Sequence, residues 1–363
     1  MNRLVYLFKR LGLGLPVMLF GLTIAFMVMY LGPIDPVLTI LGRDAEPMAA
    51  RQLRIQLGLI YPDGTPVPLW DQYRMVLSDL ITFNFGQSWT IQRGTAVGEL
   101  IVGRMPATIW MGFWSVVIAL LFGIPIGLFA GLRANTWSDY FASGFGIIWR
   151  AMPNFWLAVM IAGLLSAGGA LSAYRDWWIQ TDVIGTPDEL YRMFTGLHVF
   201  EGIPILEWFW IPIPNAEPIL TAFKWILPAA LVLGSASMGN EIRIGRTAVL
   251  ESIHSKYVET ARAKGLSERR IIAKHVGRNA VVPLLPVIMG EFYLLIGGSV
   301  LVEQVFSING LGNLFFRSVL GPDIPLVMAL VFFFIIFQVL FNITQDLLYT
   351  FIDPRITLEG AER

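Results

Sequence analysis

Long apolar runs are the feature that most constrains the fold of this chain. They lie at 11–31, 107–132, 141–167, 223–242, 284–306 and 325–351. A helix that crosses a bilayer needs about 20 predominantly apolar residues. Only 14% of the residues are charged, against roughly 25% in soluble domains. The sequence therefore predicts an all-α polytopic membrane protein with six transmembrane helices and argues against a soluble, disordered or nucleic-acid-binding protein.

The positions of the basic residues predict the orientation, because cytoplasmic loops carry an excess of Lys and Arg. With both termini inside, the inner segments hold 15 of the 26 Lys and Arg residues. These segments are 1–10, 133–140, 243–283 and 352–363. Loop 243–283 alone holds nine and decides the assignment.

This assignment divides the chain into consecutive parts. They are an N-terminal anchor at 1–31, an external loop or cap at 32–106, a transmembrane core at 107–351 and a cytoplasmic tail at 352–363. The core contains an external insertion at about 168–222 and the inner loop at about 243–283. Within the insertion, 199–214 is apolar but holds Glu201, Glu207 and three prolines. We expect an interfacial or re-entrant segment there; a seventh span, the alternative, would reverse the orientation downstream.

The external cap is expected to contain two helices. One has helical periodicity near 48–59. The other places one set of apolar side chains on a single face, namely Trp70, Tyr73, Leu77, Leu80 and Ile81. That face predicts packing against an apolar surface. Turn residues at 61–64 and 66–68 separate the two helices.

Residue types that carry enzyme chemistry are scarce. The chain has no Cys, and its three histidines, His198, His254 and His275, form no zinc-binding spacing. It lacks a GxxxxGK[ST] phosphate loop and a GxSxG nucleophile motif. We therefore expect no metal site and little support for an intramembrane hydrolase.

The inner loop predicts a helix, a glycine turn and a second helix. Ile253, Tyr257 and Ala261 form an apolar stripe on a charged helix. Gly265 suits the left-handed position that ends this helix, and Ser267 suits the N-cap of a second helix from about 268 to 276. The residues support equally a partner-docking element and an amphipathic connector held by anionic lipid.

The same loop resembles the EAA loop of ABC-importer permeases. The resemblance rests on Glu259, Ala261, Gly265 and the apolar return at 281–283, while Thr260 departs from the family's Ala. The run 257–270 is similar to the peptide and nickel permease branch. Further segments resemble the B-type subunit of dipeptide and oligopeptide importers, namely 31–36, 85–88, 104–108, 303–306, 310–312 and 342–355.

The resemblance implies a type I importer fold in which a coupling helix inserts into a separate ATPase subunit. The implied coupling residues are Glu259, Ala261, Gly265, Leu266, Ser267, Glu268, Arg269 and Arg270. The insertion at 168–222 is longer than the family leads us to expect, so its role is not carried over.

The implied partners are a second homologous permease, two ATP-binding subunits (identical or paired) and an external solute-binding protein. ATP and Mg²⁺ belong to the ATPase subunits, and this chain is expected to bind no cofactor. The implied location is a prokaryotic cell membrane. The implied substrates are di- or oligopeptides, with nickel chelates or oligosaccharides as the alternative within the same complex type. A secondary transporter or channel is the remote alternative from another class.

Polar side chains inside the predicted spans are candidates for the translocation path, because such groups are costly in hydrocarbon. They are Arg150, Glu291, Glu303, Asn342 and Asp346. Arg150 either binds a substrate carboxylate or pairs with Glu291 or with a carboxylate of the second permease. In the last span, Asn342 and Asp346 share a polar stripe with Gln338 and Gln345 that favours helix–helix hydrogen bonding over pore lining.

Overall fold

The chain forms two compact units that are not consecutive in sequence. The computed structural model describes residues 3–32, 35–42, 44–179, 194–198, 210–214, 216–291 and 300–352. The first unit joins 1–105 to 311–346 and 358–363, and the second joins 106–310 to 347–357. The predicted anchor, the predicted cap and most of the predicted last span therefore belong to one unit.

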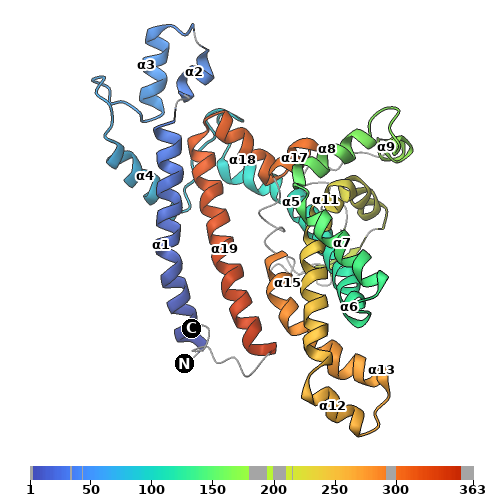
Figure 1. Ribbon diagram of the computed structural model, residues 1–363. Helices are drawn as coiled ribbons and strands as arrows, with labels where there is room; N and C mark the ends of the chain where they lie inside the picture. Colours follow the sequence, from blue (N-terminus) through green and yellow to red (C-terminus); the bar gives the residue numbers. More distant parts are fainter. Residues whose placement is uncertain are drawn as a thin grey trace. The chain divides into compact units, whose positions relative to one another are not determined.

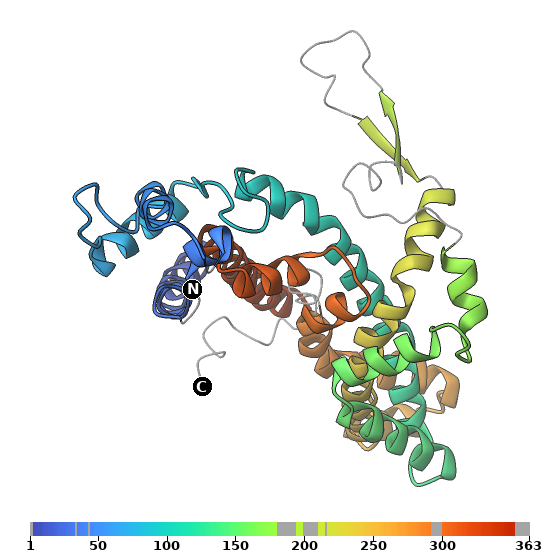
Figure 2. The ribbon, with the colours of Figure 1, turned by 90° about the horizontal axis from the view of Figure 1, so that it is seen from above.

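The first unit is helical in its described part. It contains α1 (Arg3–Tyr30), α2 (Pro36–Leu41), α3 (Pro47–Gln56), α4 (Leu69–Ile81), α18 (Leu311–Leu320), most of α19 (Ile324–Ile352) and the start of α5 (Val97–Ile118). Helices α1 and α19 lie side by side (Figures 1 and 2), with Gly14 and Gly21 of α1 facing Val339 and Ile335 of α19. Small residues at such positions let membrane helices approach closely.

The start of α19 is fixed by Asp323, which is fully buried. Its carboxylate accepts hydrogen bonds from Ser88 Oγ at 2.5 Å, from the backbone N–H of Thr90 at 3.0 Å and from that of Ile91 at 3.1 Å. These bonds satisfy a charge that is otherwise costly to bury. They also attach the segment before α5 to the beginning of α19.

The cap helices form as predicted, but one predicted face is only partly buried. Leu80 is buried, and Tyr73 packs against the core of this unit and exchanges a 2.6 Å hydrogen bond with Thr23 of α1. Trp70 and Ile81 are 65% and 66% exposed, so their predicted packing is wrong for this chain alone. The predicted apolar face of α4 is thus wider than the part that contacts α1.

The second unit contains the remaining helices and a two-stranded sheet. After α5 come the π-helix η1 (Ala119–Gly123), α6 (Ile124–Leu132), α7 (Trp137–Ala151), α8 (Asn154–Leu164), α9 (Ser172–Ile179), β1 (Phe194–His198), β2 (Trp210–Pro214) and α11 (Ala216–Ile253). The last part contains α12 (Lys256–Ala263), α13 (Glu268–Arg270), the π-helix η2 (Ile271–Gly277), α14 (Arg278–Val281), the 3-10 helix η3 (Val282–Leu284), α15 (Leu285–Glu291) and α17 (Val300–Val305). The predicted helical class is confirmed, with one β-hairpin added.

Several of the predicted spans are present as long apolar helices. Among the described residues, four helices are long and apolar enough to cross a membrane, at Arg10–Tyr30, Val97–Leu132, Ala222–Ile253 and Ile324–Leu347. The predicted span 141–167 is instead a helix pair, α7 and α8, bent by 97°. Pro153 explains the break, because the residue before a proline avoids the helical region and Met152 is extended. Part of the predicted span 284–306 lies outside the described residues, so the six-span count stays a prediction.

The external insertion contains a β-hairpin that the sequence did not predict. Residues 210–214 form β2, which pairs antiparallel with β1 from Phe194↔Pro214 to His198↔Trp210. A spanning helix through 199–214 is therefore wrong, and residues 199–209 lie outside the described part. Helix α11 starts soon after this hairpin and continues beyond the predicted end of its span at 242. The first basic residues of the predicted inner loop are thus helical.

Helices α6 and α11 pack through a stripe of glycines. Gly123, Gly127 and Gly131 recur every fourth residue, so they share one face of the chain. A Cβ added at Gly127 would lie 2.8 Å from the carbonyl oxygen of Ile242 and 2.9 Å from that of Glu241. The backbones of the two helices are therefore in direct contact, as the small residues in this predicted span indicate.

Candidate functional site

The inner loop folds into a helix–glycine–helix element at the end of α11 (Figure 1). Gly265 has a φ of +74°, the left-handed conformation that the sequence predicts. Its N–H donates to the Arg262 carbonyl at 2.9 Å, and the Leu266 N–H donates to the Ala261 carbonyl at 3.3 Å. These two bonds form a Schellman motif, which ends α12.

The second helix of the element begins as predicted but has a different hydrogen-bonding pattern. Ser267 occupies the N-cap of α13 in an extended conformation, without a side-chain cap hydrogen bond. Only 268–270 are α-helical, and the predicted helix continues as the π-helix η2. An ion pair between Arg262 Nε and Glu268 Oε1, at 3.1 Å, links α12 to α13 across the turn. Because both side chains are exposed, this pair contributes little to stability.

The apolar side of the element packs on its own chain. Val258 and Ile271 are fully buried and Ala261 is 5% exposed, in a cluster with Ala248 and Val249 of α11. Leu266 packs against this cluster from the turn. Ala261, a member of the predicted apolar stripe, and its neighbour Val258 thus hold the element on α11 and face away from solvent. Helix α12 is thereby packed directly against α11.

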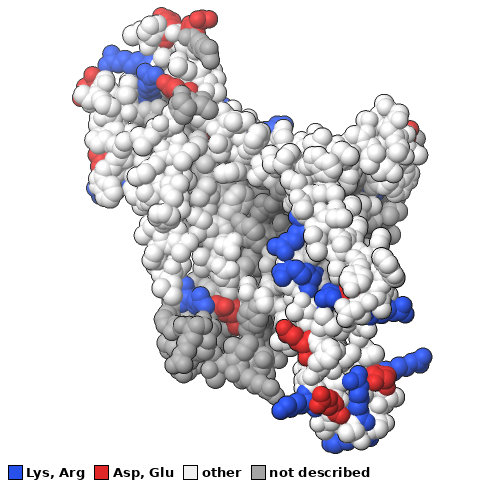
Figure 3. Space-filling model, in the orientation of Figure 1, with Lys and Arg blue, Asp and Glu red and all other residues white. Residues whose placement is uncertain are grey.

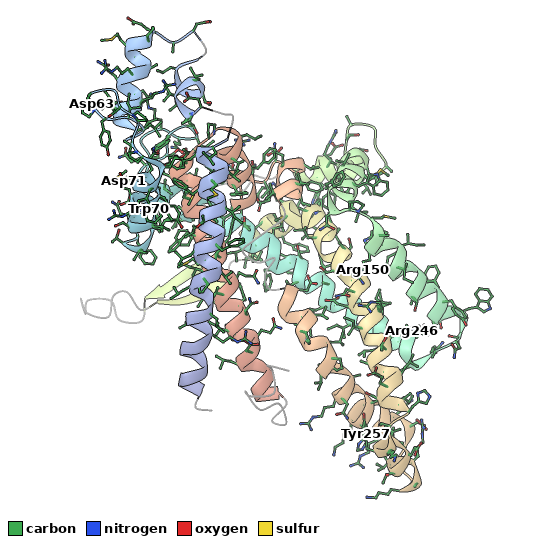
Figure 4. The ribbon with its side chains drawn as sticks, turned by 60° about the vertical axis from the view of Figure 1, so that its left-hand side comes forward. Asp63, Trp70, Asp71, Arg150, Arg246 and Tyr257 are labelled. Carbon is green, nitrogen blue, oxygen red and sulfur yellow. The ribbon has the colours of Figure 1, made fainter. Side chains whose placement is uncertain are left out.

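The exposed side of the element is largely polar. It comprises Lys256, Tyr257, Glu259, Thr260, Arg262, Ala263, Lys264, Gly265, Ser267, Glu268, Arg269 and Arg270. Figure 3 shows charged side chains of both signs gathered over this end of the second unit, and Figure 4 places Tyr257 on it. Within the described residues the Glu259 carboxylate has no hydrogen-bond or ion-pair partner.

Most of the predicted polar residues of the membrane interior have internal partners. Glu303 is fully buried and accepts a 2.8 Å hydrogen bond from Thr108. Asp346 forms a 3.1 Å ion pair with Arg10, which joins α19 to α1. Asn342 accepts a 3.2 Å hydrogen bond from Gln338 on the same helix. The Glu303 and Asp346 contacts join helices within each unit, whereas the Asn342 bond lies within α19.

Arg150 does not pair with Glu291, and this predicted alternative is wrong. Glu291 accepts a 2.6 Å hydrogen bond from Ser237 of α11. Arg150 lies in the last turn of α7, beside the break before α8, and its side chain is exposed. Its Cβ lies 2.9 Å from the position that a Cβ added at Gly239 of α11 would occupy. The Pro153 break therefore places Arg150 at a bend and not in the middle of a straight span.

Two charged groups of the second unit were not singled out from the sequence. Arg246 donates to the buried Asp139 carboxylate from Nε at 2.6 Å and from Nη2 at 2.8 Å, which joins α11 to α7. Glu241 is fully buried against Gly123, and neither carboxylate oxygen has a hydrogen-bond partner among the described residues. No sequence signal identifies the partner of either group.

The fold and this site define a helical, multi-pass membrane protein with an exposed, charged helix–glycine–helix element beside its spans. The chain belongs to the family described as binding-protein-dependent transport system inner membrane component, whose sequence pattern matches residues 123–358. It therefore has the type I fold of ABC-importer permeases and is a multi-pass inner-membrane protein.

Relatives match nearly the whole chain. The dipeptide transport system permease protein DppB of Alkalihalophilus pseudofirmus is 30% identical over 97% of this chain and 99% of its own length. The oligopeptide transport system permease protein AppB of Bacillus subtilis is 31% identical over 97% of this chain and 98% of its own. The dipeptide permease DppB of Escherichia coli is 29% identical over the same shares.

Proposed function

We propose that this chain is a translocation subunit of an ATP-driven importer for di- or oligopeptides, and that residues 256–270 couple it to a separate ATPase subunit. The exposed helix–glycine–helix element carries the proposal. Its apolar side is held by α11, and its polar side is open to a partner. The relatives named as dipeptide and oligopeptide permeases support the substrate class.

In this mechanism the chain contributes movement and leaves ATP chemistry to its partners. ATP and Mg²⁺ bind at two ATPase subunits, and this chain pairs with a second, similar permease. Closure of the ATPases displaces α12, and the buried cluster around Val258 and Ile271 passes the displacement to α11. Glycine contacts with α6 then move that helix with α11. Peptide delivered by an external binding protein enters as the two permeases alternate between outward and inward openings.

Gly265 gives the sharpest test of coupling. The positive φ strains any β-branched residue, whereas Asn tolerates it, and the space around Gly265 is open. We expect Gly265→Val to leave ATP hydrolysis measurable while lowering peptide uptake by tenfold or more. Gly265→Asn, the matched control, is expected to retain most of the uptake.

The measurement compares ATP hydrolysis and uptake of a labelled dipeptide in vesicles that contain the complete importer. Co-purification of the ATPase subunits shows whether each variant assembles. Equal uptake per ATP in Gly265→Val and the unaltered complex would contradict the coupling role. Uptake of nickel chelates or oligosaccharides in place of peptides would contradict the proposed substrate class. It would leave the proposed coupling role of 256–270 intact.

A further inference from the structure

A basic pocket lies between α7 and α11 in the second unit. Its volume is about 490 Å³, within the range of pockets that bind small molecules. Tyr140, Ser143 and Arg150 line it from α7, and Arg243 and Arg246 line it from α11. Figure 4 shows Arg150 and Arg246 in the space between these two helices.

The pocket has an excess of positive charge. Asp139 is its one acidic lining residue, and this carboxylate is occupied by the two hydrogen bonds from Arg246. Arg150 has no hydrogen bond or ion pair with the residues that the structure describes. Arg243 makes one side-chain bond, to Asn240 at 3.2 Å. Two guanidinium groups are therefore available to an anion.

The pocket opens beside an apolar face of α7. Trp137, Phe141, Ile147 and Ile148 are 90%, 78%, 67% and 60% exposed. In a membrane protein, such side chains contact acyl chains or another membrane subunit. Aromatic residues such as Trp137 at a helix end are typical of the headgroup level.

The position of the pocket along α11 indicates the membrane surface on which it lies. Arg243 and Arg246 are the first cations of the segment 243–283, which holds nine Lys and Arg residues. Such an excess is typical of the cytoplasmic side. The basic groups and the apolar face thus meet at the level of the inner headgroups.

We propose that this pocket binds the phosphate of an anionic phospholipid from the inner leaflet, with the acyl chains lying along α7. Guanidinium groups match phosphate oxygens in a bidentate geometry. Basic pockets between transmembrane helices on the cytoplasmic side suit anionic headgroups for the same reason. The site rests on the membrane placement of the chain and does not depend on what is transported.

Lipid retention by the complete importer tests the site. The probes are dioleoyl phosphatidylglycerol and dioleoyl phosphatidylcholine, added to the purified complex and counted by native mass spectrometry. We expect phosphatidylglycerol to be retained preferentially, and Arg150→Gln or Arg243→Gln to weaken its retention roughly fivefold to tenfold. Arg150→Lys keeps the charge and is expected to retain most of the binding.

Arg133→Gln is the matched control. It removes one cation from the same predicted side of the membrane, outside the pocket, where Arg133 stacks on Phe129 at 5.0 Å. Retention of phosphatidylglycerol is expected to be unchanged in this variant. Gly265→Val is expected to lose transport coupling and to retain phosphatidylglycerol normally. The coupling role and the lipid site are therefore tested independently.

Three outcomes would overturn the proposal. The first is equal retention of the two lipids by the unaltered complex. The second is displacement of phosphatidylglycerol by millimolar inorganic phosphate, which would make the site one for a free anion. The third is weaker pairing of the two permeases in Arg150→Gln with normal lipid retention, which would assign Arg150 to a carboxylate of the second permease.

Discussion

At the residue scale, two buried carboxyl groups of the second unit have opposite surroundings. Glu303 and Glu241 are both fully buried. Glu303 accepts a hydrogen bond from Thr108, whereas the carboxylate oxygens of Glu241 have no partner among the described residues. A satisfied buried polar group holds its neighbours in place, and an unsatisfied one costs about 1–3 kcal/mol. A buried Glu therefore stabilises the fold at position 303 and destabilises it at position 241.

Replacing each Glu by Met separates these effects, because Met has a similar length and needs no hydrogen bond. We expect Glu241→Met to raise the melting temperature of the purified complex, and Glu303→Met to lower it. The expected changes are about 1–3 kcal/mol of unfolding free energy in each direction. A drop in melting temperature for both variants would show that Glu241 has a stabilising partner.

At the element scale, the contact between α6 and α11 depends on the absence of side chains. The glycine stripe places the backbone of α6 against carbonyl oxygens of α11. Such atoms cannot move aside like the end of a flexible side chain. The Val258 and Ile271 cluster then joins this helix pair to the helix–glycine–helix element.

Gly127→Ala tests this contact with the smallest possible change. Its Cβ would meet two backbone oxygens below 3 Å, so we expect a loss of about 1–3 kcal/mol in stability. Gly144→Ala in α7 is the control, because nothing lies within 4 Å of its added Cβ. Thermal unfolding of the two purified variants gives the comparison, and equal stability would contradict the close approach of α6 and α11.

At the scale of the whole molecule, the first unit joins the two ends of the sequence. Helix α1 packs against α19, and Arg10 pairs with Asp346 at 3.1 Å. The N-terminal anchor is thus part of a folded unit and is not an isolated tether. This arrangement has a direct chemical test, because the chain has no cysteine of its own.

A Gly14→Cys and Val339→Cys pair is expected to form a disulfide on mild oxidation. A Cβ at Gly14 would lie 3.7 Å from the Cβ of Val339, and disulfides need Cβ atoms about 3.5–4.5 Å apart. Gly12→Cys with Val339→Cys is the control, because a Cβ at Gly12 has no neighbour within 4 Å. Gel mobility before and after reduction reports the bond, and equal crosslinking of the two pairs would contradict the packing of α1 on α19.

The sequence by itself determined the properties that depend on local chemistry. The shortage of charge and the length of the apolar runs specify a helical membrane protein, and most of these runs form long helices. Gly265 was predictable because only a residue that tolerates positive φ ends a helix in this way. The motifs of the inner loop, together with those of the further matching segments, identified the family.

The tertiary structure decided which side chains of different helices are in contact. Ala261 faces the core of its own chain, and Glu291 bonds to Ser237 and not to Arg150, because the packing of α11 sets these neighbours. Periodicity gave Trp70 the same face as Tyr73, but only Tyr73 reaches α1. Local patterns report what a segment needs to bury, while contact between distant segments depends on the space that the other helices leave.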